Sequence, residues 1–317
     1  MTKGEPLPAK PRVTARAKKK GDRDRTLFIV SFLSPAVLLY AVFVLWPLFQ
    51  AFAFSMYRWR GVSAHRKFVG MENFSKLAHD QAFAKAVTNN LELLIVGGFV
   101  VLVVSVALAH AMQGTGKMAK ALRSVILLPQ MVSLVVVATL WMFIFNPNFG
   151  LLTSGMKAVG LGKFVHTWLA EPQTALPSVG IAFAWYAIGF YALLFSTAIR
   201  SLPEEVGEAA ALDGATGFRR FWRVTWPMLW SVKRIAVVHL TITVMNVFAL
   251  VFLMTSGGPD RATEVLLTYL YENAFVNSQF GYATAIAIAN FALVMVLSLI
   301  ILAFFRRDPQ EPRRVRA

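Results

Sequence analysis

One charged stretch between two long apolar runs decides the fold of this chain: it runs from Ser201 to Leu229 and reads SLPEEVGEAAALDGATGFRRFWRVTWPML. Ser201 and Glu204 match the S-x-x-E capping box, which predicts a helix start. A mostly apolar face follows at helical spacing and consists of Leu202, Val206, Ala209, Ala210 and Asp213. Gly214 supplies the left-handed stop that ends such a helix. The first half is therefore predicted to be a short amphipathic helix.

The second half of the stretch predicts another short helix. Thr216 is a suitable N-cap for it. Phe218, Phe221 and Trp222 then fall on one helical face. Pro227 interrupts the pattern just before the next apolar run. The whole stretch is predicted to be two short helices joined by a turn, on the cytoplasmic face of a membrane protein.

These residues resemble the EAA loop of permease subunits in binding-protein-dependent ABC importers. That loop has the pattern E-A-A, three residues, G, nine residues, I, one residue, L-P. Glu208-Ala209-Ala210, Gly214 and Pro227 match it in register. Val224 replaces the isoleucine conservatively, and Trp226 replaces the leucine, which is the clear departure.

The resemblance implies that the stretch holds a coupling helix, which docks in a cleft of an ATPase subunit and transmits force to the membrane helices. The residues that it assigns to this coupling are Glu208, Ala209, Ala210, Asp213, Gly214 and Pro227. A solvated amphipathic loop without a partner is the alternative interpretation.

Composition places the chain in a membrane. Its 317 residues are 57% hydrophobic and 15% charged, whereas a typical soluble domain has about 25% charged residues. The net charge is +16, but the charges lie in tails and loops between apolar runs, which favours an anionic lipid surface over nucleic acid as partner. The chain has no cysteine, which excludes disulfides and thiolate ligands.

Six uncharged runs each hold the roughly 20 residues that cross a bilayer as a helix. The predicted fold class is therefore an all-α polytopic membrane bundle of six transmembrane helices with a cytoplasmic coupling-helix loop at 200–230; the resemblance gives it the type I ABC importer permease fold. The permease domain is predicted at 27–305, with spans near 28–52, 89–112, 122–146, 175–199, 233–254 and 281–305.

Charge predicts the orientation. With both termini cytoplasmic, the cytoplasmic pieces hold 23 Lys and Arg residues and the outer loops hold 9. The basic tail at 1–26 is expected to be disordered and to act as an orientation signal, and 306–317 is a second cytoplasmic tail. The resemblance implies a multi-pass protein of the bacterial plasma (inner) membrane.

Two further segments resemble the carbohydrate-uptake type of this permease family, which includes the maltose, lactose and glycerol-3-phosphate importer permeases. The first, FVGMENF at 68–74, predicts a turn at Gly70 and a surface helix over 73–86. The second spans 255–285 and includes a sharp outer turn at 257–259. Glu92, the one acid within a predicted span, is expected at a helix start near the outer interface, stabilised by the helix dipole.

Candidate substrate-path residues lie in the fourth and fifth predicted spans. Aromatic rings with polar tips suit stacking on sugar faces, but they equally suit ordinary helix packing. The family's pocket is lined from these two spans, which makes the candidates Tyr186, Phe190, Tyr191, Thr243 and Asn246. His239 is interpreted as an interface histidine rather than a path residue.

The resemblance implies the permease subunit of an ATP-driven ABC importer that translocates a sugar or oligosaccharide; glycerol-3-phosphate or a polyol is the alternative cargo. The implied partners are a second homologous permease, two ATPase subunits and an extracytoplasmic binding protein, besides membrane lipid. No G-x-x-x-x-G-K-[ST] motif is present, so ATP and Mg²⁺ are expected on the partner ATPase, and this chain is expected to have no cofactor, metal or catalytic residue.

Two other classes of protein were weighed. A gradient-driven secondary carrier predicts coupling carboxylates in the middle of the membrane, and none is found there. A polytopic membrane enzyme predicts clustered Asp, Glu or His at one interface, which the sequence also lacks.

Overall fold

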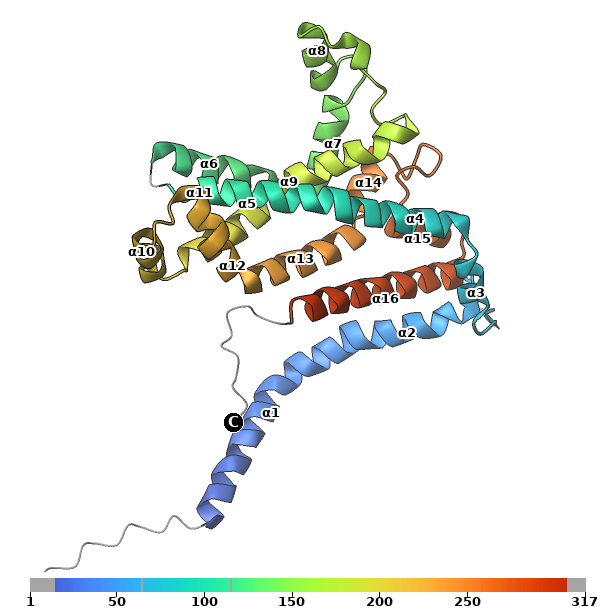
Figure 1. Cartoon of the computed structure of the whole chain (residues 1–317). Helices are drawn as coiled ribbons and strands as arrows, with labels where there is room; N and C mark the ends of the chain where they lie inside the picture. The colour runs from blue at the N-terminus through green and yellow to red at the C-terminus, as the bar shows by residue number, and fades with distance from the viewer. Residues whose placement is uncertain (1–14, 64, 115, 307–317) are drawn as a thin grey trace, which may run out of the picture. The chain divides into compact units, whose positions relative to one another are not determined.

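The computed structural model describes residues 15–63, 65–114 and 116–306 (Figure 1). These residues are almost wholly helical, and their only strands, β1 (Tyr57–Arg58) and β2 (Lys67–Phe68), form a short antiparallel hairpin. The chain divides into two units, the first ending at Ala53 and the second beginning at Phe54.

The first unit is helical from its first described residue. Helix α1 (Ala15–Tyr40), the π-helical turn η1 (Ala41–Leu45) and helix α2 (Trp46–Ser55) follow one another without a break. The part Arg25–Ser55 has a mean hydropathy of 2.4 and exposes its apolar side chains, as a helix in lipid does. The expected disorder is wrong for residues 15–26, which are helical; residues 1–14 lie outside the described part of the chain.

Three further helices are long and apolar enough to cross a membrane. One is the 31-residue helix Gln81–Ala111, which consists of α4 (Gln81–Glu92), η2 (Leu93–Gly97) and α5 (Gly98–Ala111). The others are α9 (Pro172–Arg200) and α16 (Phe280–Phe304). Helix α5 packs along α9 and buries much of the apolar core between them. With Arg25–Ser55, these make four candidate spans in the described chain.

Two bent helix pairs raise the number of candidate spans to as many as six, if each pair counts as one span. The first consists of α6 (Lys117–Leu127), the 3-10 turn η3 (Leu128–Met131) and α7 (Leu134–Ile144), with a bend of 102°. The straight helix implied by the predicted span at 122–146 is therefore wrong. Pro129 lies in η3, and Val132 and Ser133, which link η3 to α7, have an extended backbone.

The second bent pair joins the charged stretch to the fifth predicted span. Helix α11 (Gly217–Arg220), the π-helical turn η5 (Phe221–Thr225) and α12 (Trp226–Met228) lead into α13 (Trp230–Met245) through a bend of 73°. Helix α14 (Ala249–Met254) follows a break at 246–248, so the predicted span at 233–254 is not one continuous helix either.

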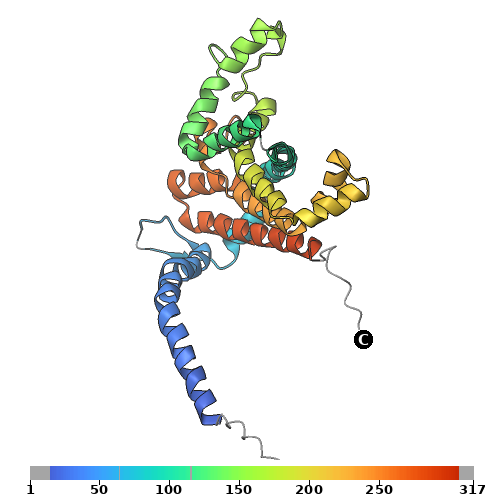
Figure 2. The same ribbon diagram turned by 90° about the vertical axis from the view of Figure 1, so that its left-hand side faces the viewer.

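Helices α10 (Glu204–Leu212) and α3 (Glu72–Ala78) lie at opposite ends of the bundle formed by the second unit (Figure 1). Helix α15 (Leu266–Tyr271) packs against α4 and α16, and η6 (Glu272–Val276) packs against α15 and α16. Helix α8 (Leu151–Ala158) and the short η4 (Gly162–Phe164) extend away from the bundle, beyond α7 (Figure 2).

The surface helix predicted over 73–86 is split in two. Gly70 has a φ of +56°, which confirms the predicted turn, but α3 ends at Ala78 and α4 begins at Gln81. Asp80 forms the new N-cap and accepts hydrogen bonds from the backbone N–H groups of Ala82 (2.9 Å) and Phe83 (3.3 Å). Because α4 starts this early, Glu92 lies three turns inside the helix, and the expected dipole stabilisation of Glu92 is wrong.

Candidate functional site

The charged stretch begins where α9 ends. Ser201 caps the C-terminus of α9, and its hydroxyl donates to the carbonyl of Ala198 (2.8 Å). Helix α10 starts only at Glu204, with Pro203 as its N-cap residue. The predicted capping box is therefore wrong, because Ser201 is still bonded to the preceding helix. Glu204 and Glu205 occupy the first turn of α10, where the helix dipole favours negative charge.

Gly214 ends α10 in the way the sequence predicts. Its φ is +74°, and its N–H donates to the carbonyl of Ala211 (3.0 Å) while that of Ala215 donates to Ala210 (2.8 Å). This pair of bonds is the Schellman motif, in which the left-handed residue is nearly always glycine. Thr216 then takes the extended N-cap position of α11, although its side chain makes no capping hydrogen bond.

Helix α10 turns its buried face toward α11. Gly207 and Ala210 are buried, and a Cβ at Gly207 would lie 2.5 Å from Nη2 of Arg220. The apolar face predicted from the sequence is thus partly wrong, because Ala209 and Asp213 are exposed.

The exposed face of α10 is a stripe at i, i+3, i+4 and i+7 spacing, made of Glu205, Glu208, Ala209 and Leu212. Leu212 is 90% exposed. Within the described residues, no ion pair or hydrogen bond from a side chain engages the carboxylates of this loop, which belong to Glu204, Glu205, Glu208 and Asp213. The hairpin of α10 and α11 also projects from the bundle (Figures 1 and 2). It therefore presents an acidic, partly apolar helix face that a partner can contact.

An aromatic cluster joins this hairpin to the membrane helices. The ring of Trp226 lies 5.6 Å from that of Trp222, 6.2 Å from that of Phe221 and 6.4 Å from that of Phe195 in α9. Trp226 is the residue that departs from the family pattern. Its ring packs against Phe195 of α9, so the segment that follows α11 is in contact with a spanning helix. Pro227 occupies the first turn of α12, just before the bend.

Two of the predicted path residues meet across α9 and α13. The hydroxyl of Tyr191 lies 2.9 Å from Nδ1 of His239, and the ring of Phe190 stacks on the same imidazole with centroids 4.9 Å apart. Tyr191 is buried, whereas Phe190 and His239 are exposed. The sequence interprets His239 as a satisfied interface histidine, and its bond to Tyr191 across the two helices agrees with that interpretation. The particular partner was not predicted; the available signal was the spacing of His239, which Thr243 and Asn246 follow by four and seven residues.

Thr243 is linked to this pair through His239, whereas Asn246 and Tyr186 make their contacts elsewhere. Thr243 donates to the carbonyl of His239 (2.8 Å), one turn away, and Asn246 accepts from Nδ2 of Asn290 in α16 (3.3 Å). Tyr186 packs against the apolar core, and its carbonyl accepts a hydrogen bond from Gln130 (2.7 Å). The structure therefore aligns four candidates along α13 and its neighbours, while Tyr186 has a packing contact.

A helical bundle with up to six candidate spans and a projecting amphipathic hairpin is the architecture expected of a membrane permease. The model of the family described as "Binding-protein-dependent transport system inner membrane component" matches residues 101–308. The chain belongs to this family, and it is a transport subunit of the inner membrane.

Named relatives agree over most of the chain. It is 34% identical over 282 residues to the probable ABC transporter permease protein YurN of Bacillus subtilis, covering 88% of this chain and 96% of the relative. It is 34% identical over 298 residues to the diacetylchitobiose uptake system permease protein NgcF of Streptomyces coelicolor, and the alignment covers 90% of this chain and 84% of the relative. These matches confirm the resemblance drawn from the EAA-like stretch.

A solved structure confirms the fold. It is a bacterial alginate ABC transporter in complex with an alginate pentasaccharide-bound periplasmic protein, and one of its chains is similar with a TM-score of 0.76. The alignment has 23% sequence identity and covers 90% of this chain and 96% of that one. The predicted all-α permease fold is therefore confirmed.

Proposed function

We propose that this chain is the membrane-spanning permease subunit of an ATP-driven importer whose cargo is a sugar or oligosaccharide. The relative from Streptomyces coelicolor belongs to a diacetylchitobiose uptake system, and the structural neighbour belongs to a transporter of the polysaccharide alginate. Both names point to carbohydrate cargo.

The exposed stripe on α10 is the observation that carries the proposal. It combines the E-A-A register with carboxylates that have no partner in the described chain, on a hairpin anchored to α9 through Trp226. Glu208 and Ala209 contact the ATPase on this stripe, while Ala210 and Gly214 shape the helix behind it. Asp213 caps the last turn, and Pro227 sets the start of the bend. ATP and Mg²⁺ are bound by the partner ATPase.

The open position of the path residues supports a second permease subunit. Phe190, His239 and Asn246 are exposed, so this chain alone leaves one side of the path uncovered. A homologous permease closes it, two ATPase subunits sit below the pair, and an extracytoplasmic binding protein delivers the cargo. ATP-driven closure of the ATPases shifts the population of the permease pair from inward-facing to outward-facing.

The distribution of Lys and Arg supports an orientation with both termini in the cytoplasm. Helix α10 then lies in the cytoplasm, where an ATPase can reach it. The hairpin of β1 and β2, at the other end of the second unit, faces outward.

Reconstitution tests the proposal. The complete complex, assembled from the chain with its binding protein, second permease and ATPase, is placed in proteoliposomes and supplied with labelled oligosaccharides. We expect uptake that requires both ATP and the binding protein. Uptake driven by an ion gradient without ATP would contradict the proposal. Selective uptake of glycerol-3-phosphate would show that the cargo is glycerol-3-phosphate and not a sugar.

A further inference from the structure

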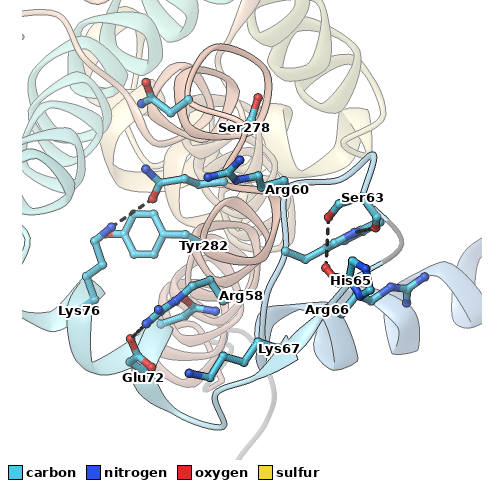
Figure 3. Close-up of a pocket in the computed structure, with 14 residues that line it drawn as sticks. Arg58, Arg60, Ser63, His65, Arg66, Lys67, Glu72, Lys76, Ser278 and Tyr282 are labelled. Carbon is cyan, nitrogen blue, oxygen red and sulfur yellow. Dashed lines mark hydrogen bonds and ion pairs between the residues drawn. The ribbon is translucent and has the colours of Figure 1, made fainter.

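A basic pocket of about 720 Å³ lies at the end of the second unit opposite α10 (Figures 1 and 3). Its walls come from the segment around β1 and β2, from α3 and from the start of α16. One carboxylate lines it, that of Glu72. The Lys and Arg side chains that line it number five and are Arg58, Arg60, Arg66, Lys67 and Lys76.

Contacts within the protein neutralise little of this charge. Arg58 forms an ion pair with Glu72. Lys76 donates to Oε1 of Gln279 (3.2 Å), which carries no charge to balance it. Arg60 and Lys67 are exposed and have no ion-pair or hydrogen-bond partner from their side chains among the described residues. In Figure 3 both extend toward the side of the pocket on which Lys76 and Glu72 lie.

This concentration of charge is unusual for an outer face. Under the proposed orientation, the outer loops hold nine Lys and Arg residues, and five of them line this one pocket. Outer loops of membrane proteins are normally poor in Lys and Arg. Like charges gathered in one pocket repel each other unless a counter-charge is bound. The pocket therefore fits an anion.

The position of the pocket in the chain indicates where that anion comes from. Arg58 follows the last residue of α2 by three positions, and Tyr282 lies in the first turn of α16; both helices belong to candidate spans. The ring of Trp59, between them, lies 6.0 Å from that of Phe280. Aromatic residues at span ends mark the headgroup level of a bilayer. This position indicates that the pocket lies at the depth of the lipid phosphates.

We infer that this pocket binds the phosphate of an anionic phospholipid headgroup. Arg60 provides a planar guanidinium that can donate two parallel hydrogen bonds to phosphate oxygens, and Lys67 adds a point charge. Lys76, held over the ring of Tyr282 at 4.2 Å, supplies a third cation at the opposite wall. The inference rests on the proposed function in one respect: the proposed orientation places the pocket in the outer leaflet.

Lipid retention tests the inference. The complex is reconstituted in nanodiscs of mixed phosphatidylglycerol and phosphatidylcholine, released, and measured by native mass spectrometry without ATP. In a chain carrying Arg60→Gln and Lys67→Gln, we expect bound phosphatidylglycerol to fall at least about fivefold, since each basic residue near a lipid surface contributes substantially to anionic lipid binding. Lys157→Gln with Lys163→Gln, which removes the same charge from another outer loop, is the control and should retain the lipid.

Three results would overturn the inference. The first is equal retention by the pocket variant and the wild-type complex. The second is saturable binding of soluble glycerol phosphate to the complex in discs of phosphatidylcholine alone, at least as tight as the binding of phosphatidylglycerol in mixed discs, because the site would then take a free anion. The third is loss of binding-protein-stimulated ATP hydrolysis by the pocket variant in those same discs, which would assign the pocket to a protein surface.

The orientation has its own readout. The chain has no cysteine, and Val62, 96% exposed, lies beside the pocket in sequence, so Val62→Cys can be labelled in intact cells with a membrane-impermeant maleimide. Labelling from outside is expected. If labelling fails while lipid is still retained, the outer leaflet and the proposed orientation are wrong together. Loss of ATP-dependent uptake by the wild-type complex would count against the proposed function alone.

Discussion

At the scale of single residues, Asp80 shows how one carboxylate joins several elements. It caps α4, and it also accepts hydrogen bonds from the hydroxyls of Tyr269 in α15 and Tyr282 in α16. Burial acts to raise the pKa of Asp80, but these hydrogen bonds outweigh it and hold the pKa below its ordinary value of 3.8. For the same reasons, burial and the bond to Asp80 raise the pKa of Tyr269 to about 12.

The lowered pKa of Asp80 predicts a pH dependence. A carboxylate whose pKa is lower in the folded state stabilises the fold fully above its unfolded pKa, and this stabilisation is lost as the pH falls through the folded value. Asp80→Asn should lower the free energy of unfolding by about 1–3 kcal/mol at pH 7, because bonds to a charged acceptor are lost. Thermal unfolding of the wild type and the variant in detergent, between pH 7 and pH 3, measures this difference in stability. The difference in stability between variant and wild type should narrow only below pH 3.8. A difference that does not change with pH would contradict this role of Asp80.

Glu208 provides the residue-scale test of coupling. Glu208→Lys reverses the charge in the middle of the exposed stripe without a buried contact to disturb. We expect membrane insertion to be unchanged and ATP-dependent uptake to fall at least about tenfold, which corresponds to a loss of roughly 1.4 kcal/mol. Val62→Lys places the same side chain on the other face and should leave uptake unchanged. Normal uptake by Glu208→Lys would remove Glu208 from the coupling site.

At the scale of elements, local signals and long-range contacts differ in what they allow one to predict. Gly214 could be predicted from the sequence because the Schellman motif depends on a few neighbouring residues. The start of α10 could not be predicted in this way, because Ser201 is hydrogen-bonded to α9. The break at Asp80 also depends on Tyr269 and Tyr282, nearly 200 positions away in the chain. The exposure of Ala209 likewise follows from which face α11 covers.

Two substitutions at Gly214 separate conformation from hydrogen bonding. Alanine strains the backbone at a φ of +74°, at a cost of about 1–2 kcal/mol. Proline cannot adopt that φ, and it also removes the N–H that donates to Ala211. We therefore expect Gly214→Ala to reduce coupled uptake and Gly214→Pro to abolish it, with both variants inserted in the membrane. Similar uptake by the two variants, measured in proteoliposomes, would show that the shape of this turn is not required.

At the scale of the whole molecule, apolar runs predict membrane crossings better than they predict straight helices. Four of the six predicted spans fall on continuous helices, the span at 122–146 falls on a bent pair, and the span at 233–254 falls on α13 and α14 with a break between them. Because hydropathy is averaged over a window of residues, it does not detect the 102° bend after η3 or the 73° bend at Leu229. Of the path candidates, the pairing of Tyr191 with His239 depends on how α9 packs on α13, which spacing within either helix cannot give.

The central claim is that the exposed face of α10 is held by an ATPase, and site-specific crosslinking measures this directly. Ala209→Cys and Ala210→Cys are matched variants of a chain that has no other cysteine; Ala209 is exposed and Ala210 is 6% exposed. Each is labelled with a photoreactive maleimide in the assembled complex and illuminated. We predict capture of the ATPase subunit from position 209 and much less from position 210. If position 209 never captures the ATPase, the coupling role of this loop is contradicted.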